Sequence, residues 1–467
     1  MISTLRIALS GLAVMSALGS IAQAEPSTQE NAGRPNILFI FADDWGWGDL
    51  SCHGSKVYKT PNLDKLAATG TDFHRFTVAS GVCSPSRTAV MTGHYPARYC
   101  IHQHFASVEH HIKCGMPDWL PPDAPSLPRL LKEAGYATAH FGKWHLTNGH
   151  VPDAPVPTAY GYDESAVFNG PGPQVNANPT KEAPTATHKA IDFIRRHREQ
   201  PFFINLWVHA THTPHYPTER WLKQFEHLEK RQQVYAAVVA ETDERIGQVL
   251  AVLDELELAE NTLVIFSSDN GPENSGPRKR QDDAATGRGL GTFYSVGTTG
   301  GLRGRKRSLF HGGVGVPFLV RWPGVVPTGK KDATTITTAV DLLPTFCEIA
   351  GADLPENYQS DGQNILPALR GKEFNRRRPI FWQWHGARHG ENWPRLGAQD
   401  GPWTLLMNED GSRAELYNTL DDRGQAKNVF DKHPQIAKRL TGQVFAWKKT
   451  LPNSPPEGCF SKLRKQP

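Results

Sequence analysis

Residues 36–44 read "NILFIFADD", an apolar run that stops at two carboxylates. The first seven residues of this stretch predict a short buried β-strand. The two aspartates come directly after it, at the point where the strand ends. In open α/β sheets, ligands bind beyond the carboxyl ends of the strands. The stretch therefore predicts both a central strand and one wall of a binding site.

The chain on either side of this strand alternates helical and strand-like segments. "TPNLDKLAATG" is a helix that Thr60 can cap, and "TLVIFSS" is a strand that follows a long amphipathic helix. This alternation is typical of a sheet with helices on both faces. We predict an α/β fold, with a large, mostly parallel sheet sandwiched by helices, over residues 32–372.

The pattern changes after Arg370, where short strands such as "PIFWQW" and "WTLLMN" are followed by a last helix. We predict a smaller C-terminal α+β domain at 373–452, with an antiparallel sheet and a helix.

The first 24 residues carry a basic residue, a short apolar run and an Ala-Gln-Ala end. We expect a signal peptide at 1–24 that is cleaved after Ala24, and hence a periplasmic or secreted protein without a membrane anchor. The net charge of +4 on 467 residues suits an anionic ligand but does not demand nucleic acid. The six cysteines are too few and scattered for a disulfide scaffold, although export would permit a bond such as Cys100–Cys114.

Polar side chains follow four of the predicted strands at the points where they end. The acidic members carry only oxygen ligands, which select Ca²⁺ or Mg²⁺ over zinc. Three basic residues would face this cation and form a binding site for an anion: Lys143, Arg87 and Lys306. The implied ligand is a negatively charged tetrahedral group. The strand-end residues are Asp43 and Asp44, Lys143 and His145, His209 and His212, and Asp269 and Asn270.

Cys83 begins the segment "CSPSRTAVMTG", which predicts a helix with the cysteine at its N-terminus. Amide dipoles at that position favour an anion and would lower the pKa of a thiol. A thiolate nucleophile is nevertheless prone to oxidation in an oxidising compartment. A plain thiol at residue 83 therefore fits poorly.

These motifs resemble those of the type I, formylglycine-dependent sulfatase family of the alkaline phosphatase superfamily. "CSPSRTAVMTG" resembles the family's Cys-X-Pro-Ser-Arg signature, and "GKWH", "HATHTPH" and "SSDNG" follow in the family's order. The resemblance runs from about Arg34 to about residue 430. It implies that a maturation enzyme converts Cys83 to Cα-formylglycine. It also implies that a Ca²⁺ ion binds beside this residue. The metal ligands that it implies are Asp43, Asp44, Asp269, Asn270 and residue 83 itself.

The resemblance also implies roles for the basic residues. Arg87 would hold the formylglycine, Lys143 and Lys306 would grip sulfate oxygens, His145 would assist at residue 83, and His212 would face the leaving oxygen. One departure from the family is His311, where many relatives carry an acidic residue. The amino-acid sequence is also similar to those of bacterial sulfatases that act on marine polysaccharides such as carrageenans. We therefore expect a sulfated carbohydrate substrate. The expected substrate-binding residues are His102, His104, His311 and Trp384, although Trp384 could equally pack the two domains together.

Two other functions remain open at this point. A phosphate or phosphonate ester hydrolase of the same superfamily would leave the Cys-X-Pro-Ser-Arg motif unexplained. A catalytically inactive protein that binds sulfated glycans would not need the complete set of candidate groups. Nucleic-acid binding through "RGRKR" at 303–307 is disfavoured by the expected export.

Overall fold

The computed structural model describes residues 1, 33–175, 182–273, 295–385 and 393–464. Nearly all of the expected signal peptide at 1–24 lies outside these ranges. The described residues from Gly33 onward form one compact unit.

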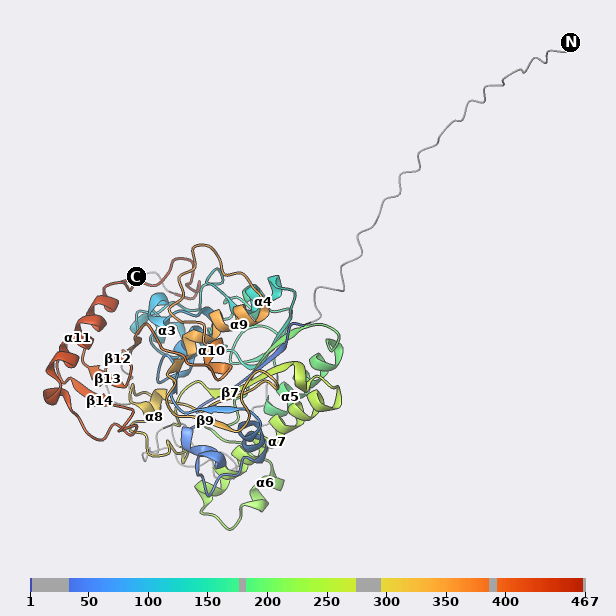
Figure 1. The fold of residues 1–467 in the computed structure, drawn as a ribbon, viewed down its shortest axis with the longest axis horizontal. Helices are drawn as coiled ribbons and strands as arrows, with labels where there is room; N and C mark the ends of the chain where they lie inside the picture. Colours follow the sequence, from blue (N-terminus) through green and yellow to red (C-terminus); the bar gives the residue numbers. More distant parts are fainter. Residues whose placement is uncertain (2–32, 176–181, 274–294, 386–392, 465–467) are drawn as a thin grey trace. The chain divides into compact units, whose positions relative to one another are not determined.

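An eight-stranded sheet forms the centre of this unit (Figure 1). β1 lies between β6 and β7 and runs parallel to both, whereas β8 runs antiparallel to β7 and β2. The prediction of a mostly parallel sheet is confirmed. In their order across the sheet, the strands are β5 (Glu164–Phe168), β4 (Ala137–Lys143), β6 (Phe202–Trp207), β1 (Asn36–Ala42), β7 (Thr262–Ser268), β8 (Phe318–Arg321), β2 (Thr71–Phe73) and β9 (Lys330–Asp332).

Helices cover both faces of the sheet. The side chains of β1 therefore alternate between two hydrophobic cores, one on each face. Phe39 and Phe41 pack in the core that includes α2, α4 and α9, whereas Leu38 and Ile40 pack in the core that includes α1, α5 and α7. Both cores exclude water, so β1 is apolar along its whole length. The bounds are α1 (Pro61–Ala68), α2 (Cys83–Thr92), α4 (Leu127–Glu133), α5 (Glu182–Arg196), α7 (Lys230–Glu255) and α9 (Leu342–Ala350). Shorter elements are α3 (Val108–Lys113), α6 (Glu219–Gln224), α8 (His311–Val314), α10 (Leu366–Leu369) and the strand pair β3 (Phe76–Thr77) and β10 (Thr337–Thr338).

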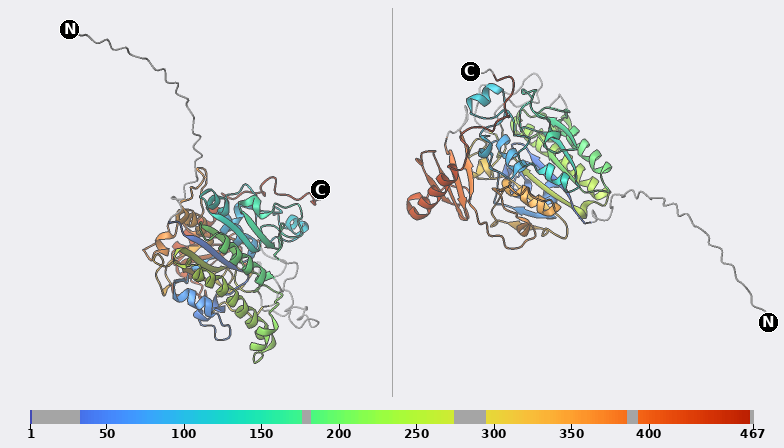
Figure 2. Two further views of the ribbon diagram at one scale, coloured as in Figure 1. Left: turned by 90° about the vertical axis from the view of Figure 1, so that its right-hand side faces the viewer. Right: turned by 90° about the horizontal axis from the view of Figure 1, so that it is seen from above.

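A second, four-stranded antiparallel sheet follows in the last part of the chain, as predicted (Figure 2). Its strands are β11 (Ile380–Gln383), β12 (Leu396–Asp400), β13 (Trp403–Met407) and β14 (Glu415–Asn418), and α11 (Pro434–Lys448) packs on β12 and β13. The indole N–H of Trp382 donates to the carbonyl of Val78 over 2.8 Å, so the two sheets share one core. The boundary at 372/373 stays a prediction.

Two further expectations concern the membrane and the cysteines. Among the residues that the structure describes, no helix is both long and apolar enough to cross a bilayer. All six cysteines are free, so the bond between Cys100 and Cys114 that export would permit is not formed.

Candidate active site

The predicted strand ends meet at one edge of the large sheet. β1 and β7 pair in parallel with Ala42 opposite Ser268, and the amide of Asp269 donates to the carbonyl of Ala42 over 3.0 Å. Asp43 and Asp269 are therefore neighbours, although 226 residues separate them in the chain. β6 and β4 continue the sheet on the other side of β1 and bring their own terminal residues to the same edge.

Asp43 and Asp44 turn their side chains toward different basic residues. Asp43 Oδ2 lies 2.5 Å from Lys143 Nζ and 2.5 Å from His209 Nδ1. Asp44 Oδ2 lies 2.6 Å from Lys306 Nζ. Asp44 has a positive φ of 59°, and this left-handed turn separates the two successive carboxylates.

The third carboxylate, Asp269, is held by Arg87. Arg87 Nη2 lies 2.7 Å from Asp269 Oδ2 and 3.8 Å from Asp43 Oδ1. Its guanidinium also lies over the ring of Trp207, with 4.8 Å between the guanidinium carbon and the ring centroid. Arg87 is fully buried. A buried guanidinium that is paired and stacked in this way is fixed in position.

Two buried oxygens in this group accept no hydrogen bond, and they provide the test of a metal site. They are Asp43 Oδ1 and Asn270 Oδ1. The Asn270 amide nitrogen donates to Asp44 Oδ1 over 2.7 Å, which ties Asn270 to the carboxylates while its own oxygen accepts no hydrogen bond. Burial, reinforced by the charge of Asp43, raises the pKa of Asp269 to about 7. Oxygens that crowd together in a buried site are what a hard divalent cation requires, so the residues present fit Ca²⁺.

Cys83 lies beside this cluster at the first position of α2. Its Sγ and one carboxylate oxygen each from Asp43 and Asp269 all lie within 4.8 Å of one another. Burial raises the pKa of the thiol, and the side chain is almost inaccessible. An unmodified Cys83 would therefore be a neutral thiol at pH 7, and it would be a poor nucleophile.

His145 and His212 each have one ring nitrogen facing a backbone carbonyl. His145 Nε2 lies 2.7 Å from the carbonyl oxygen of Phe105, and its Nδ1 is buried without a hydrogen-bond partner. His212 Nδ1 lies 2.6 Å from the carbonyl oxygen of Thr213, and its Nε2 lies 3.7 Å from Asp44 Oδ2. Because a carbonyl requires a donor, these contacts place the proton of each neutral ring and leave the other nitrogen as an acceptor.

The pKa values of both histidines are low. Burial, with the charge of Lys143, lowers the pKa of His145 well below its ordinary value. Burial, with the charge of Lys306, does the same for His212. Both rings are therefore neutral at pH 7, and each can accept a proton.

The site contains three residues to which we had assigned no role from the sequence: His209, Glu273 and Arg307. His209 stacks on His212 with 4.8 Å between ring centroids and contacts Asp43. Glu273 is buried, forms a bidentate pair with Arg307 and lies 3.6 Å from Lys306 Nζ. The position of His209 directly after β6 was a usable signal. Glu273 follows the "DNG" turn and carried no such signal.

The expected substrate-binding residues differ in where they lie. The ring centroid of His104 is 6.3 Å from that of His145, so this residue lies beside the site. His102 stacks on His385 at 3.8 Å and is nearly buried. Burial lowers the pKa of both His102 and His104 to about 3, so both rings are neutral.

The expectation for His311 stays a prediction, whereas that for Trp384 requires a correction. His311 lines a small cavity together with Arg75, Thr419 and Arg423, and none of the proposed catalytic or metal residues lines it. Trp384 has no exposed surface and belongs to the shared core. A ring without exposed surface cannot stack on a sugar, so the packing alternative holds for Trp384.

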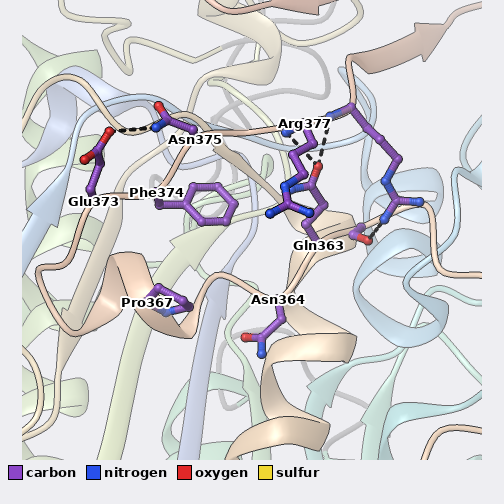
Figure 3. Close-up of a pocket in the computed structure, with 9 residues that line it drawn as sticks. Gln363, Asn364, Pro367, Glu373, Phe374, Asn375 and Arg377 are labelled. Atoms are coloured by element: carbon purple, nitrogen blue, oxygen red, sulfur yellow. Dashed lines mark hydrogen bonds between the residues drawn. The ribbon is translucent and has the colours of Figure 1, made fainter.

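A further cavity is lined by Pro367 of α10 and by residues of the segments that precede and follow this helix (Figure 3). Gln363, Phe374, Asn375 and Arg377 are among its lining residues, and the amide of Arg377 donates to Gln363 Oε1 over 3.1 Å. None of the proposed catalytic or metal-binding residues lines this cavity.

Comparison with known proteins settles the family. Residues 35–352 match the sulfatase family model, and residues 304–450 match the model of the N-sulphoglucosamine sulphohydrolase C-terminal region. The chain belongs to the sulfatase family. This sulfatase is thus a sulfuric ester hydrolase of the alkaline phosphatase superfamily, as the motifs around Cys83 predicted.

Relatives of this sulfatase are found in animals and bacteria. It is 35% identical over 390 residues to N-acetylgalactosamine-6-sulfatase of Homo sapiens, an alignment that covers 74% of this chain and 68% of the relative. It is 28% identical to N-acetylgalactosamine-6-O-sulfatase of Bacteroides thetaiotaomicron, with 94% and 98% covered. The crystal structure of Ps i-CgsB in complex with k-i-k-neocarrahexaose superposes with a TM-score of 0.72 at 26% identity and covers 89% of this chain and 92% of that one.

Proposed function

We propose that this sulfatase is an exported enzyme that releases sulfate from a sulfated carbohydrate, with Cα-formylglycine at residue 83 and a Ca²⁺ ion. The observation that carries the proposal is the position of Cys83, where the side chain at the N-terminus of α2 meets Asp43 and Asp269. The relatives named for N-acetylgalactosamine 6-sulfate and the superposed structure that holds neocarrahexaose support a carbohydrate. A carrageenan-type oligosaccharide is one candidate.

The proposed metal ligands are Asp43, Asp44, Asp269, Asn270 and residue 83. Ca²⁺ bound by these oxygens would neutralise charge that develops on the sulfuryl group. Lys143 and Lys306 contact two of the same carboxylates. Once a cation balances those carboxylates, the two ammonium groups are available to bind sulfate oxygens.

The remaining roles follow from which atoms are free to act. Cα-formylglycine, when hydrated, supplies a hydroxyl nucleophile and a second hydroxyl for its own regeneration. Arg87 orients residue 83 through its fixed contacts with Asp269 and Asp43. His145 accepts a proton at Nδ1, since its Nε2 is occupied by the carbonyl of Phe105. His212, whose side chain is 23% exposed, presents Nε2 to the leaving oxygen. Because this nitrogen is unprotonated in the neutral ring, it would first take a proton from solvent, which the negative charge of the bound sulfate ester would favour, and then donate that proton to the leaving oxygen.

The proposal includes export and maturation. The signal at 1–24 would direct the chain to the periplasm or outside the cell, and a formylglycine-generating or equivalent enzyme would act on Cys83 before the chain folds. The order matters because the folded structure buries this cysteine almost completely.

The test is sulfate release from defined substrates by protein whose residue 83 has been characterised by mass spectrometry. Ion chromatography would measure sulfate from N-acetylgalactosamine 6-sulfate, carrageenan oligosaccharides and nitrophenyl sulfate, with Cys83→Ala as the control. We expect turnover only from protein in which oxygen replaces the sulfur of Cys83. Faster hydrolysis of phosphate or phosphonate esters would favour the superfamily alternative. Glycan binding by matured protein without any turnover would favour an inactive binding protein.

A further inference from the structure

A second group of metal-binding side chains lies outside the proposed active site. Cys52 and His53 belong to the 3₁₀ helix Ser51–His53, and Asp72 belongs to β2. One ligand atom from each of these three residues lies within 4.8 Å of the other two. We propose that Cys52, His53 and Asp72 bind a structural Zn²⁺ ion, a site independent of the sulfatase reaction.

The contacts of His53 point to a ligand rather than to a simple hydrogen bond. Its Nδ1 lies 2.7 Å from the carbonyl oxygen of Trp47, so Nδ1 carries the proton. The other nitrogen, Nε2, faces Asp72 at 2.9 Å and 3.1 Å from the two carboxylate oxygens. A neutral ring cannot donate to both, so Nε2 either carries a second proton, in an imidazolium paired with Asp72, or binds a metal ion. A backbone carbonyl on one nitrogen and a metal on the other is the usual arrangement of a metal-binding histidine.

The distances are compatible with a tetrahedral ion. With bonds of about 2.0–2.1 Å to nitrogen and oxygen, the edge between two such ligands is about 3.3 Å. His53 Nε2 and the nearer Asp72 oxygen would need to separate by only about 0.4 Å to reach it. Thiolate, imidazole and carboxylate together match the preferences of zinc, whereas calcium would require oxygen alone. Water would complete the coordination at the partly exposed Cys52.

Neighbouring residues hold these ligands in place. His74 Nε2 lies 3.0 Å from Asp72 Oδ2, the same oxygen that His53 approaches, and so helps to fix the carboxylate. The ring of Trp47 stacks on His53 with 3.9 Å between centroids, and Arg423 lies over Trp47 at 3.8 Å. Arg423 also donates to the carbonyl of His74 over 2.7 Å. An ion here would tie the segment that follows Asp43 and Asp44 to β2.

The experiment uses full-length protein with Cys83→Ala, which removes the other thiol that lies beside carboxylates. After chelation and dialysis, zinc or cobalt would be added, and bound metal would be measured by mass spectrometry of the element. We expect one more Zn²⁺ per chain than in the same protein carrying Cys52→Ser. Co²⁺ should give a sulfur-to-cobalt charge-transfer band that Cys52→Ser abolishes. His74→Ala should weaken zinc binding about 10- to 100-fold, since His74 acts through Asp72.

Cys114→Ser is the matched control, because Cys114 is also partly exposed and lies 3.6 Å from a histidine nitrogen, that of His110. It should leave the zinc content and the cobalt band unchanged. Equal zinc content with and without Cys52, or a cobalt spectrum without the band, would overturn the proposal. The spectrum of the parent protein decides the matter even if Cys52→Ser does not fold. Because no turnover is measured, the result does not depend on the proposed function.

Discussion

Lys306 Nζ lies 2.6 Å from Asp44 Oδ2 and 3.6 Å from Glu273 Oε2, in a site where its side chain is 4% exposed. Burial alone would lower the pKa of this ammonium group, but the two carboxylates raise it. Lys306 is therefore charged at pH 7. A charged lysine that is held between two acidic groups is suited to the sulfate-binding role that we propose for it.

The first prediction concerns Lys306. Lys306→Ala should lower kcat/KM for nitrophenyl sulfate by about 10²- to 10³-fold, the usual effect of losing one group that stabilises developing negative charge. Steady-state kinetics would measure it. Lys372→Ala, on an exposed lysine, should have no effect. If Lys306→Ala kept wild-type kcat/KM, Lys306 would have only a structural role.

The second prediction concerns His212. Its Nε2 is assigned to the leaving oxygen, and an alcohol leaves poorly without a proton. His212→Ala should therefore cost about 10²-fold or more on a sugar sulfate and markedly less on nitrophenyl sulfate, whose phenol is acidic. The ratio of the two kcat/KM values is the measurement.

The third prediction concerns His145 and provides the contrast. His145 acts at residue 83 after the alcohol has left, in a step that is the same for every substrate. His145→Ala should lower kcat by a similar factor on sugar and nitrophenyl sulfates. Identical leaving-group dependence in the His145 and His212 variants would contradict this division of roles, even with the sulfatase activity intact.

The polar residues at the edge of the large sheet were predictable from the sequence, because each one stands next to a strand that the local pattern identifies. β1 is apolar throughout and β6 and β7 are mostly apolar. Polar residues stand at the carboxyl ends of these strands and of β4, and parallel pairing places them at one edge. The helix that begins at Cys83 was equally clear, since Gly93 ends it in a left-handed conformation with φ of 64°.

Elements that depend on distant contacts were not predictable in this way. β12 has the sequence "LGAQD", which lacks the β-branched and aromatic residues that mark a strand, and it forms because β11 and β13 pair on both of its edges. The packing of Trp384 and the cavity around His311 likewise depend on contacts between the two sheets. No local pattern reports such contacts.

The fourth prediction concerns calcium. Asp269→Ala removes a proposed ligand and part of the charge that holds the ion, so bound calcium should fall from one equivalent to well below one. The calcium-selective chelator EGTA should lower the Tm of the wild type, because a bound ion favours the native state, but should not lower the Tm of Asp269→Ala. Asp353→Ala, on an exposed carboxylate, should behave like the wild type. An unchanged calcium content in Asp269→Ala would contradict the metal assignment.

The fifth prediction concerns pH and the segment near the C-terminus. Asp118 is buried and binds three partners, with His111 Nδ1 2.7 Å from Oδ1 and the Ser461 amide and Arg464 Nε each 2.7 Å from Oδ2. Burial would raise the pKa of Asp118, but these hydrogen bonds outweigh it and hold the pKa below 3.8. The stabilisation is therefore present above pH 3.8 and is lost as the pH falls through the lowered value.

Asp118→Asn removes the charge and keeps the shape, so it should lower the free energy of unfolding at pH 6 and flatten its decline between pH 4 and more acidic conditions. Urea unfolding at a series of pH values would measure both effects. The difference between variant and wild type isolates Asp118 from the carboxylates of the metal site, which titrate in the same samples. Asp123→Asn, an exposed neighbour, should reproduce the wild-type curve. Parallel curves for Asp118→Asn and the wild type would show that the lowered pKa of Asp118 does not stabilise the fold.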